Sequence, residues 1–303
     1  MVKVRPDGEL QQTSAMTPSE SIYVTVRGLQ YHCRTWGNPD HRRLFFLHGF
    51  QDVSASWQFT VDALARGWYV IAPDWRGYGL SQFSGQDAYW APDLVADLDV
   101  ILDHFEPDFP ARLVAHSMGG NTAALYAAAV PGRIEKFVNI EGMGGMPAPV
   151  DELPRRYGKW LQQLAQGTRQ RPYMDFQDFA ERMMAENPHL TPERAEFLVQ
   201  HWGMKDEDGT VIRRADPAHM QVKPDIWRLD EAMACWRRID APMLWVEGAQ
   251  SRFVNLMRGQ PDGYEARLAA FQSLAGVMTV ENAGHNVHHD QPEALAKAIE
   301  DFM

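Results

Sequence analysis

The segment that most constrains how this chain folds is Ala115-His116-Ser117-Met118-Gly119, a pentapeptide between two apolar stretches. A short, mostly apolar run at 112–114 precedes it, and a nearly all-apolar stretch at 122–130 follows it. This order predicts a strand, a sharp turn and a helix, the context in which a serine hydroxyl is held exposed above a sheet. Ser117 is therefore a candidate nucleophile. The alternative is a serine that only caps the helix, but a cap does not require the small residues that flank Ser117.

Predicted strands alternate with predicted helices along most of the chain. After a β-hairpin of 22–26 and 29–36, we expect buried strands at 44–47, 69–72, 113–115, 136–140, 243–246 and 277–280. Helices are expected at 54–65, 93–105, 118–130 and from Pro292 to the end. This alternation predicts an α/β fold with a mostly parallel sheet that helices cover on both faces.

The block from 143 to 238 interrupts the alternation. It contains no convincing strand and carries helical patterns at 157–164, 176–184, 192–201 and 231–237. Thr191 is placed to cap the third of these helices. We therefore expect a poorly ordered tail over 1–20, a core domain of 21–142 and 239–303, and a helical cap over 143–238.

The charge and composition of the chain argue against several classes of protein. The 303 residues carry a formal net charge of −11, whereas a nucleic-acid binder needs a basic face for phosphate. The cysteines, Cys33 and Cys235, lie far apart and in no motif, so we expect free thiols and a reducing, cytoplasmic setting. The sequence shows neither a signal-peptide core nor a membrane span, and it leaves the oligomeric state open.

Several predicted strands end in residues that can carry chemistry, namely His48-Gly49-Phe50, Ser117, Glu141 and His285. Because ligands of open α/β sheets bind outside the carboxyl ends of the strands, we expect these residues to converge. His285 is the candidate base, since an imidazole can take the serine proton and return it to the leaving group. The alternatives are a surface-loop histidine and a metal ligand that acts with His288 and His289. We expect His288 and His289 to be loop residues.

The backbone N–H groups of Phe50 and Met118 are the candidate oxyanion donors. Met118 follows the candidate nucleophile, and Phe50 follows His48-Gly49. A donor aimed at the developing charge contributes about 3 kcal/mol in the transition state. A structural turn with a packed histidine is the other interpretation of His48-Gly49, and both can hold together. Asp52, beside this turn, is expected to be a solvated loop residue, with a contact to the substrate as the alternative.

The segment 74–81 is expected to be architectural. Asp74 and Arg76 can bridge a loop that Gly77 and Gly79 turn. A catalytic role for Asp74 is the alternative.

Together these segments resemble the α/β-hydrolase fold superfamily. The resemblance covers 21–303 and rests on the turn around Ser117, on His48-Gly49, on 74–81 and on Gly284-His285. It implies an eight-stranded, mostly parallel sheet flanked by helices, with the helical insertion in the cap position. Within the superfamily, the cap block looks like the serine hydrolase-like branch, through Asn187-Pro188, 191–198 and 234–237.

The residue that orients His285 follows from this resemblance. In the commonest pattern of the superfamily an aspartate stands where this chain has Ser251, which cannot orient an imidazolium by charge. Some members, including haloalkane dehalogenases, carry the acid right after the strand that follows the nucleophile helix. That position is Glu141 here, and we assign it as the acid. Glu247 and Asp262 are the other candidates.

The sequence thus predicts a serine hydrolase that cleaves a small or medium carboxylic ester through an acyl-enzyme on Ser117. The substrate is expected to be a small molecule with an apolar acyl part, and no metal or organic cofactor is implied. The alternatives are a carbon–carbon bond hydrolase with the same three side chains and a non-catalytic ligand-binding protein on the same scaffold. Dehalogenase and epoxide hydrolase activities are disfavoured, because the members of this fold that perform them need an aspartate where Ser117 stands.

Overall fold

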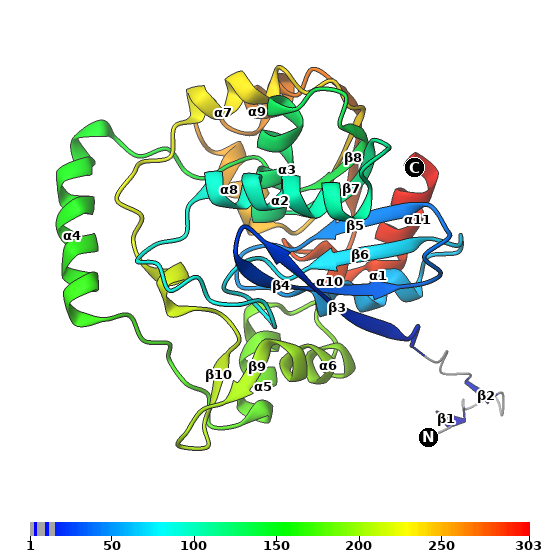
Figure 1. Ribbon diagram of the computed structural model, residues 1–303, viewed down its shortest axis with the longest axis horizontal. Coiled ribbons are helices and arrows are strands. Elements are labelled where there is room, and N and C mark those ends of the chain that lie inside the picture. Colours follow the sequence, from blue (N-terminus) through cyan, green and yellow to red (C-terminus); the bar gives the residue numbers. More distant parts are fainter. Residues whose placement is uncertain (1–2, 5–9, 12–15) are drawn as a thin grey trace.

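The computed structural model describes residues 3–4, 10–11 and 16–303 (Figure 1). Its centre is an eight-stranded sheet in the order β12-β11-β8-β7-β5-β6-β4-β3. The strands are β3 (Ser19–Val26), β4 (Leu29–Trp36), β5 (Arg43–Leu47), β6 (Tyr69–Pro73), β7 (Ala111–His116), β8 (Ile134–Ile140), β11 (Met243–Gly248) and β12 (Leu274–Val280). β4 runs antiparallel to both β3 and β6, and the other neighbours are parallel. The predicted eight-stranded, mostly parallel sheet is confirmed.

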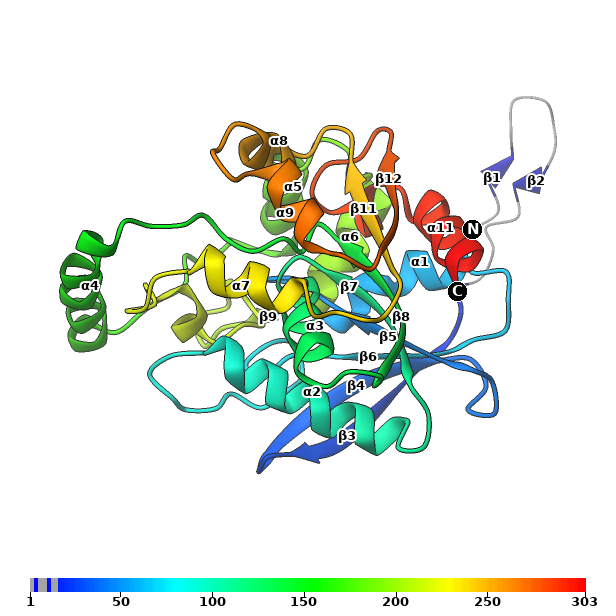
Figure 2. The same ribbon diagram turned by 90° about the horizontal axis from the view of Figure 1, so that it is seen from above.

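Helices cover both faces of this sheet (Figure 2). Successive residues of β5 alternate between the faces: Phe45 packs with one hydrophobic cluster and Phe46 with the other, and both are fully buried. One cluster includes residues of α2 (Ala91–Phe105), α3 (Met118–Ala129), α7 (Leu229–Trp236), α8 (Arg252–Arg258) and α9 (Tyr264–Ala270). The other includes residues of α1 (Gln58–Asp62), α10 (Val287–Asp290) and α11 (Pro292–Phe302). Burial on both faces explains the continuous apolar runs of the central strands.

The cap lies between β8 and β11 in the chain. It contains α4 (Leu153–Gln166) at its outer edge, α5 (Phe176–Glu186) and α6 (Pro192–Trp202) (Figure 1). The hydroxyl of Thr191 accepts a hydrogen bond from the Arg194 amide, so the predicted N-cap of α6 is confirmed. The helical cap region also contains a short antiparallel pair, β9 (Gly203–Lys205) and β10 (Val211–Arg213), where no strand was expected. Strands of three residues are too short to show an alternating pattern in sequence.

Two predicted boundaries differ from the elements of the structure. The tail over 1–20 falls largely outside the described residues, but Ser19 and Glu20 already belong to β3. Helix α7 lies within the predicted cap range, yet it packs on α3 and α9 over the sheet. Within the described part of the chain, no helix is long and apolar enough to cross a bilayer.

Candidate active site

The turn around Ser117 joins β7 to α3 as predicted. Ser117 has φ 49° and ψ −110°, a strained backbone conformation for a residue other than glycine. A Cβ atom at Gly119 would lie 2.5 Å from the Leu47 carbonyl oxygen, so only glycine lets α3 begin this close to β5. The strand therefore delivers Ser117 to the carboxyl edge of the sheet, and the small neighbour makes the sharp turn possible.

The side chains of Ser117, His285 and Glu141 form one line of hydrogen bonds. The Ser117 hydroxyl lies 3.0 Å from Nε2 of His285, and Nδ1 of His285 donates to Oε2 of Glu141 over 2.5 Å. Glu141 is 1 % exposed, whereas the His285 side chain is about one-third exposed. The register of β7 and β8 explains how two of the three side chains meet. His116 pairs with Ile140, so Ser117 and Glu141 leave neighbouring strands at the same level.

Ser251 supports the carboxylate of Glu141 instead of replacing it. Its hydroxyl donates to Oε2 of Glu141 over 2.7 Å, and the Gly248 amide donates to Oε1 over 2.9 Å. The two other predicted candidates for the acid lie elsewhere. Glu247 accepts from Trp245 and from Arg258, and Asp262 borders a separate cavity near 226–233.

The segment that carries the Phe50 amide lies directly against the nucleophile. A Cβ atom at Gly49 would lie 3.3 Å from the Cβ atom of Ser117, so the backbone that leads to Phe50 passes close to the nucleophile. His48 fixes this turn, because its Nδ1 donates to the Gly49 carbonyl and its Nε2 accepts from the Trp75 amide. Met118 is the first residue of α3, and the first amides of a helix have no carbonyl partner within it. Both predicted donors therefore belong to backbone next to Ser117.

Asp52 is buried, which corrects the expectation of a solvated loop residue. It is 3 % exposed, and its carboxylate accepts hydrogen bonds from the Val53 amide, the Ser56 hydroxyl and Nε2 of His288. Burial alone raises the pKa of Asp52, but the hydrogen bond from His288 and the nearby histidines lower this pKa well below its usual value. The carboxylate is thus ionised and anchors the segment that follows Phe50.

His288 and His289 were expected to lie in a loop, but they are buried in α10. Their exposed fractions are 0 % and 1 %. The ring of His288 packs on that of His116, and Nε2 of His116 donates to the His285 carbonyl oxygen over 2.9 Å. The segments that carry Asp52, Ser117 and His285 are therefore linked beneath the active site. Only the adjacency of two histidines to His285 hinted at this cluster in the sequence.

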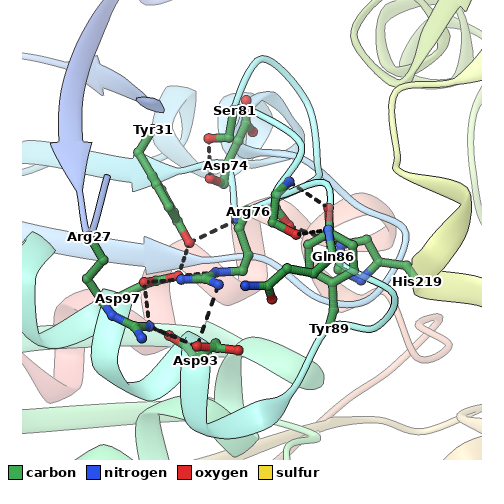
Figure 3. Close-up of polar contacts among 11 residues, drawn as sticks. Arg27, Tyr31, Asp74, Arg76, Ser81, Gln86, Tyr89, Asp93, Asp97 and His219 are labelled. Atoms are coloured by element: carbon green, nitrogen blue, oxygen red, sulfur yellow. Dashed lines mark hydrogen bonds and ion pairs between the residues drawn. The ribbon is translucent and has the colours of Figure 1, made fainter. Parts of the chain in front are cut away.

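The segment 74–81 is architectural, but Arg76 has a different partner from the one expected (Figure 3). The Asp74 carboxylate accepts from the Leu80 amide and lies against Gly79, so it holds the loop as predicted. Arg76 instead forms a two-pronged ion pair with the buried Asp97 of α2, at 2.5 and 2.6 Å. The loop is thus tied to a helix, and neither residue contacts the line of hydrogen bonds at Ser117.

A cavity of about 290 Å³ opens beside His285, between the cap and the sheet. Apart from Pro188 and Gly284, its lining is polar or charged: Glu186, Asn187, His189, Gln250, Arg252, His285 and Asn286. The side chain of Phe50, whose backbone amide is a candidate oxyanion donor, is 47 % exposed.

Comparison with known proteins agrees with this fold. A family model described as alpha/beta hydrolase fold matches residues 42–292. A serine hydrolase-like protein of Danio rerio is 26% identical over 279 residues, which is 89% of this chain and 84% of that protein. An esterase of Mycobacterium tuberculosis is 26% identical over 268 residues, 87% of this chain and 83% of that protein. The thioesterase domain from the curacin biosynthetic pathway superposes with a TM-score of 0.81 at 24% identity, over 93% of this chain and 99% of that one. This chain belongs to the alpha/beta hydrolase fold family, in its serine hydrolase-like branch, and is a hydrolase.

Proposed function

We propose that the protein hydrolyses small or medium carboxylic esters through an acyl-enzyme on Ser117. The observation that carries this proposal is the continuous line of hydrogen bonds from Ser117 through His285 to Glu141. A serine hydroxyl is a weak nucleophile until a neighbouring base takes its proton. His285 is within reach of that proton, and its other nitrogen is held by a carboxylate.

The first half of the reaction forms the acyl-enzyme. The Ser117 oxygen attacks the ester carbonyl carbon while Nε2 of His285 takes the hydroxyl proton. The carbonyl oxygen becomes an oxyanion, and the amides of Phe50 and Met118 donate to it. Glu141 stabilises the imidazolium and keeps Nδ1 of His285 protonated. When the tetrahedral intermediate collapses, His285 gives its proton to the leaving alcohol.

The second half of the reaction releases the acid. His285 takes a proton from water, whose oxygen attacks the acyl carbon, and then returns the proton to the Ser117 oxygen. Products are one alcohol and one carboxylic acid, and no cofactor is consumed. The cavity of about 290 Å³ beside His285 offers space for part of a small substrate. The exposed Phe50 side chain can contact the predicted apolar acyl part. A cytoplasmic location remains a prediction from the cysteine usage.

The test is turnover of p-nitrophenyl esters of increasing chain length, together with labelling by a fluorophosphonate probe. Ser117→Ala is expected to lower kcat by at least about 10⁴-fold, because the remaining groups supply only binding and oxyanion stabilisation. A matched control is Ser273→Ala, a serine outside the site. Full activity of Ser117→Ala would overturn the proposal. Probe labelling of a folded protein without ester turnover would point to another acyl substrate, such as the diketone of a carbon–carbon bond hydrolase.

A further inference from the structure

A buried group of potential metal ligands lies behind the active site. Nε2 of His288 is 3.0 Å and Nε2 of His289 is 3.9 Å from Oδ2 of Asp52. These three ligand atoms all lie within 4.8 Å of one another. In the described part of the chain, no other set of three His, Cys, Asp or Glu side chains meets this criterion. Asp52 comes from the segment after β5 and the histidines from α10, so the tertiary fold assembles the group.

The hydrogen bonding of this group is incomplete. Nε2 of His289 and Nδ1 of His288 are buried and have no hydrogen-bond partner among residues 16–303. Across the same residues, the ion-pair partners of the Asp52 carboxylate are these two histidines, and no lysine or arginine pairs with it. Buried charges in proteins are normally paired with a cation or coordinate a metal, and an unpartnered buried nitrogen is unfavourable. A cation placed between the three ligand atoms would pair with the Asp52 carboxylate and give Nε2 of His289 a partner.

We propose that Asp52, His288 and His289 bind a divalent transition-metal ion, with zinc as the best fit. Two imidazoles and a carboxylate are a ligand set that zinc takes in proteins, at about 2.0–2.2 Å from each atom. The ligand atoms of a tetrahedral site with such bonds lie roughly 3.3 Å apart. The separations of 3.0 and 3.9 Å are within small side-chain rotations of that value. His288 would coordinate through Nε2 after its proton moves to Nδ1, which has no partner in the metal-free protein.

Access and an open coordination position come from a neighbouring cavity. His289 lines a space of about 250 Å³ together with Trp202, Asn286 and Arg213. This space can admit the ion and hold a water as the fourth ligand. The Arg213 guanidinium packs against the rings of Phe179 and Trp202 and adds positive charge near the opening. The site is therefore expected to bind zinc more weakly than a closed structural zinc site.

Metal binding would act on hydrolysis through the oxyanion segment, and this consequence rests on the proposed function. Asp52 lies two residues after Phe50 and anchors that segment through Val53 and Ser56. A zinc ion that draws the carboxylate toward the histidines would shift the Phe50 amide. We therefore expect zinc to inhibit ester hydrolysis, and a chelator to restore it.

The experiment measures metal binding directly on the 303-residue protein, freed of metal by a chelator and dialysed. Equilibrium dialysis with zinc is expected to give one ion per chain, and cobalt(II) in its place is expected to give the intense visible absorption of a four-coordinate site. Both signals should be lost or weakened at least about tenfold in His289→Leu and in Asp52→Asn. The control is His104→Ala, which removes an exposed histidine of α2 and should leave both signals unchanged.

The outcomes separate this inference from the proposed function. Unchanged binding in both His289→Leu and Asp52→Asn, or no binding above that of unrelated proteins, would overturn the site. The dialysis readout does not need an active enzyme, so it stands even if no ester is cleaved. Zinc could also inhibit by binding His285 and Glu141. In that case His289→Leu would remain as sensitive to zinc as the unmodified protein, which would refute inhibition through this site. Circular dichroism of each variant shows that it is folded.

Discussion

The position of the acid can be tested by moving it. In Glu141→Gln the side chain keeps its shape but loses its charge, and an NH₂ group can face Nδ1 of His285, where Oε2 now accepts over 2.5 Å. Two donors would then oppose each other, and the histidine would turn or adopt the wrong tautomer. The loss is expected to be roughly 10⁴-fold in kcat, about 5.5 kcal/mol, as for removal of the triad carboxylate charge in other serine hydrolases.

A second substitution should restore part of this loss. The Ser251 hydroxyl lies 2.7 Å from the same Oε2 atom, so a carboxylate at position 251 can reach the His285 ring. Ser251 also caps α8 by accepting from the Val254 amide, and aspartate is an equally good N-cap residue. The double variant Glu141→Gln/Ser251→Asp is therefore expected to recover about 10- to 100-fold of the lost kcat, because the restored charge again fixes the imidazole.

The assay is kcat and KM for a p-nitrophenyl ester, with the free energy of unfolding measured for each variant. Ser251→Ala is the control. It removes one hydrogen bond to Glu141, worth about 1 kcal/mol, together with the hydrogen bond that caps α8, and it should lower kcat by less than about tenfold. Glu141→Gln within about threefold of the unmodified protein would refute the assignment of the acid. A double variant no faster than Glu141→Gln would refute the argument that both positions serve one carboxylate site.

Two further predictions concern buried groups near the site. Asp52→Asn removes the charge that accepts hydrogen bonds from the Val53 amide and the Ser56 hydroxyl, and so loosens the segment that carries the Phe50 amide. We expect kcat to fall roughly 10- to 100-fold with little change in KM, measured on the same ester without metal. An unchanged kcat would show that the oxyanion segment needs no anchor. Burial lowers the pKa of His219 to about 3. Below about pH 6.5 the unfolded chain therefore protonates this histidine while the folded protein keeps it neutral. The free energy of unfolding then falls by about 1.4 kcal/mol for each pH unit. His219→Phe should therefore lose about 2 kcal/mol less than the unmodified protein between pH 7 and pH 5 in urea unfolding, and equal losses would refute this account.

The fold was predictable because the physical signals that specify it are local. Each central strand is buried on both faces, which leaves a continuous apolar run such as 44–47. The turn around Ser117 was also predictable, because only small residues allow the close approach of α3 to β5. His285 follows a strand and a glycine, so its place at the sheet edge could be inferred from sequence order alone.

The partners of buried polar groups could not be predicted, because they lie far apart in the chain. Asp52 and His288 are 236 positions apart, and no property of either side chain marks the other as its partner. The sequence placed Arg76 with Asp74 in one loop, whereas the packing of α2 on the sheet brings Asp97 and Asp93 to the Arg76 guanidinium. Burial of such groups depends on which elements pack together, and residue types alone do not encode it.

The place of Glu141 shows that the acid of this site can come from either of two positions in the sequence, 141 or 251. The strand β8 lies between β7 and β11, and Ile140 pairs with His116 on one side and with Val246 on the other. The segments that follow β8 and β11 thus approach the same point. Oε2 of Glu141 occupies this point, and the Ser251 hydroxyl lies beside it. Carboxylates at both positions would be like charges within about 3 Å, and one of them would have to be protonated. A chain of this fold can therefore carry its acid at either position. A hydroxyl group suits the position without the acid, because it donates a hydrogen bond to the carboxylate and adds no second negative charge.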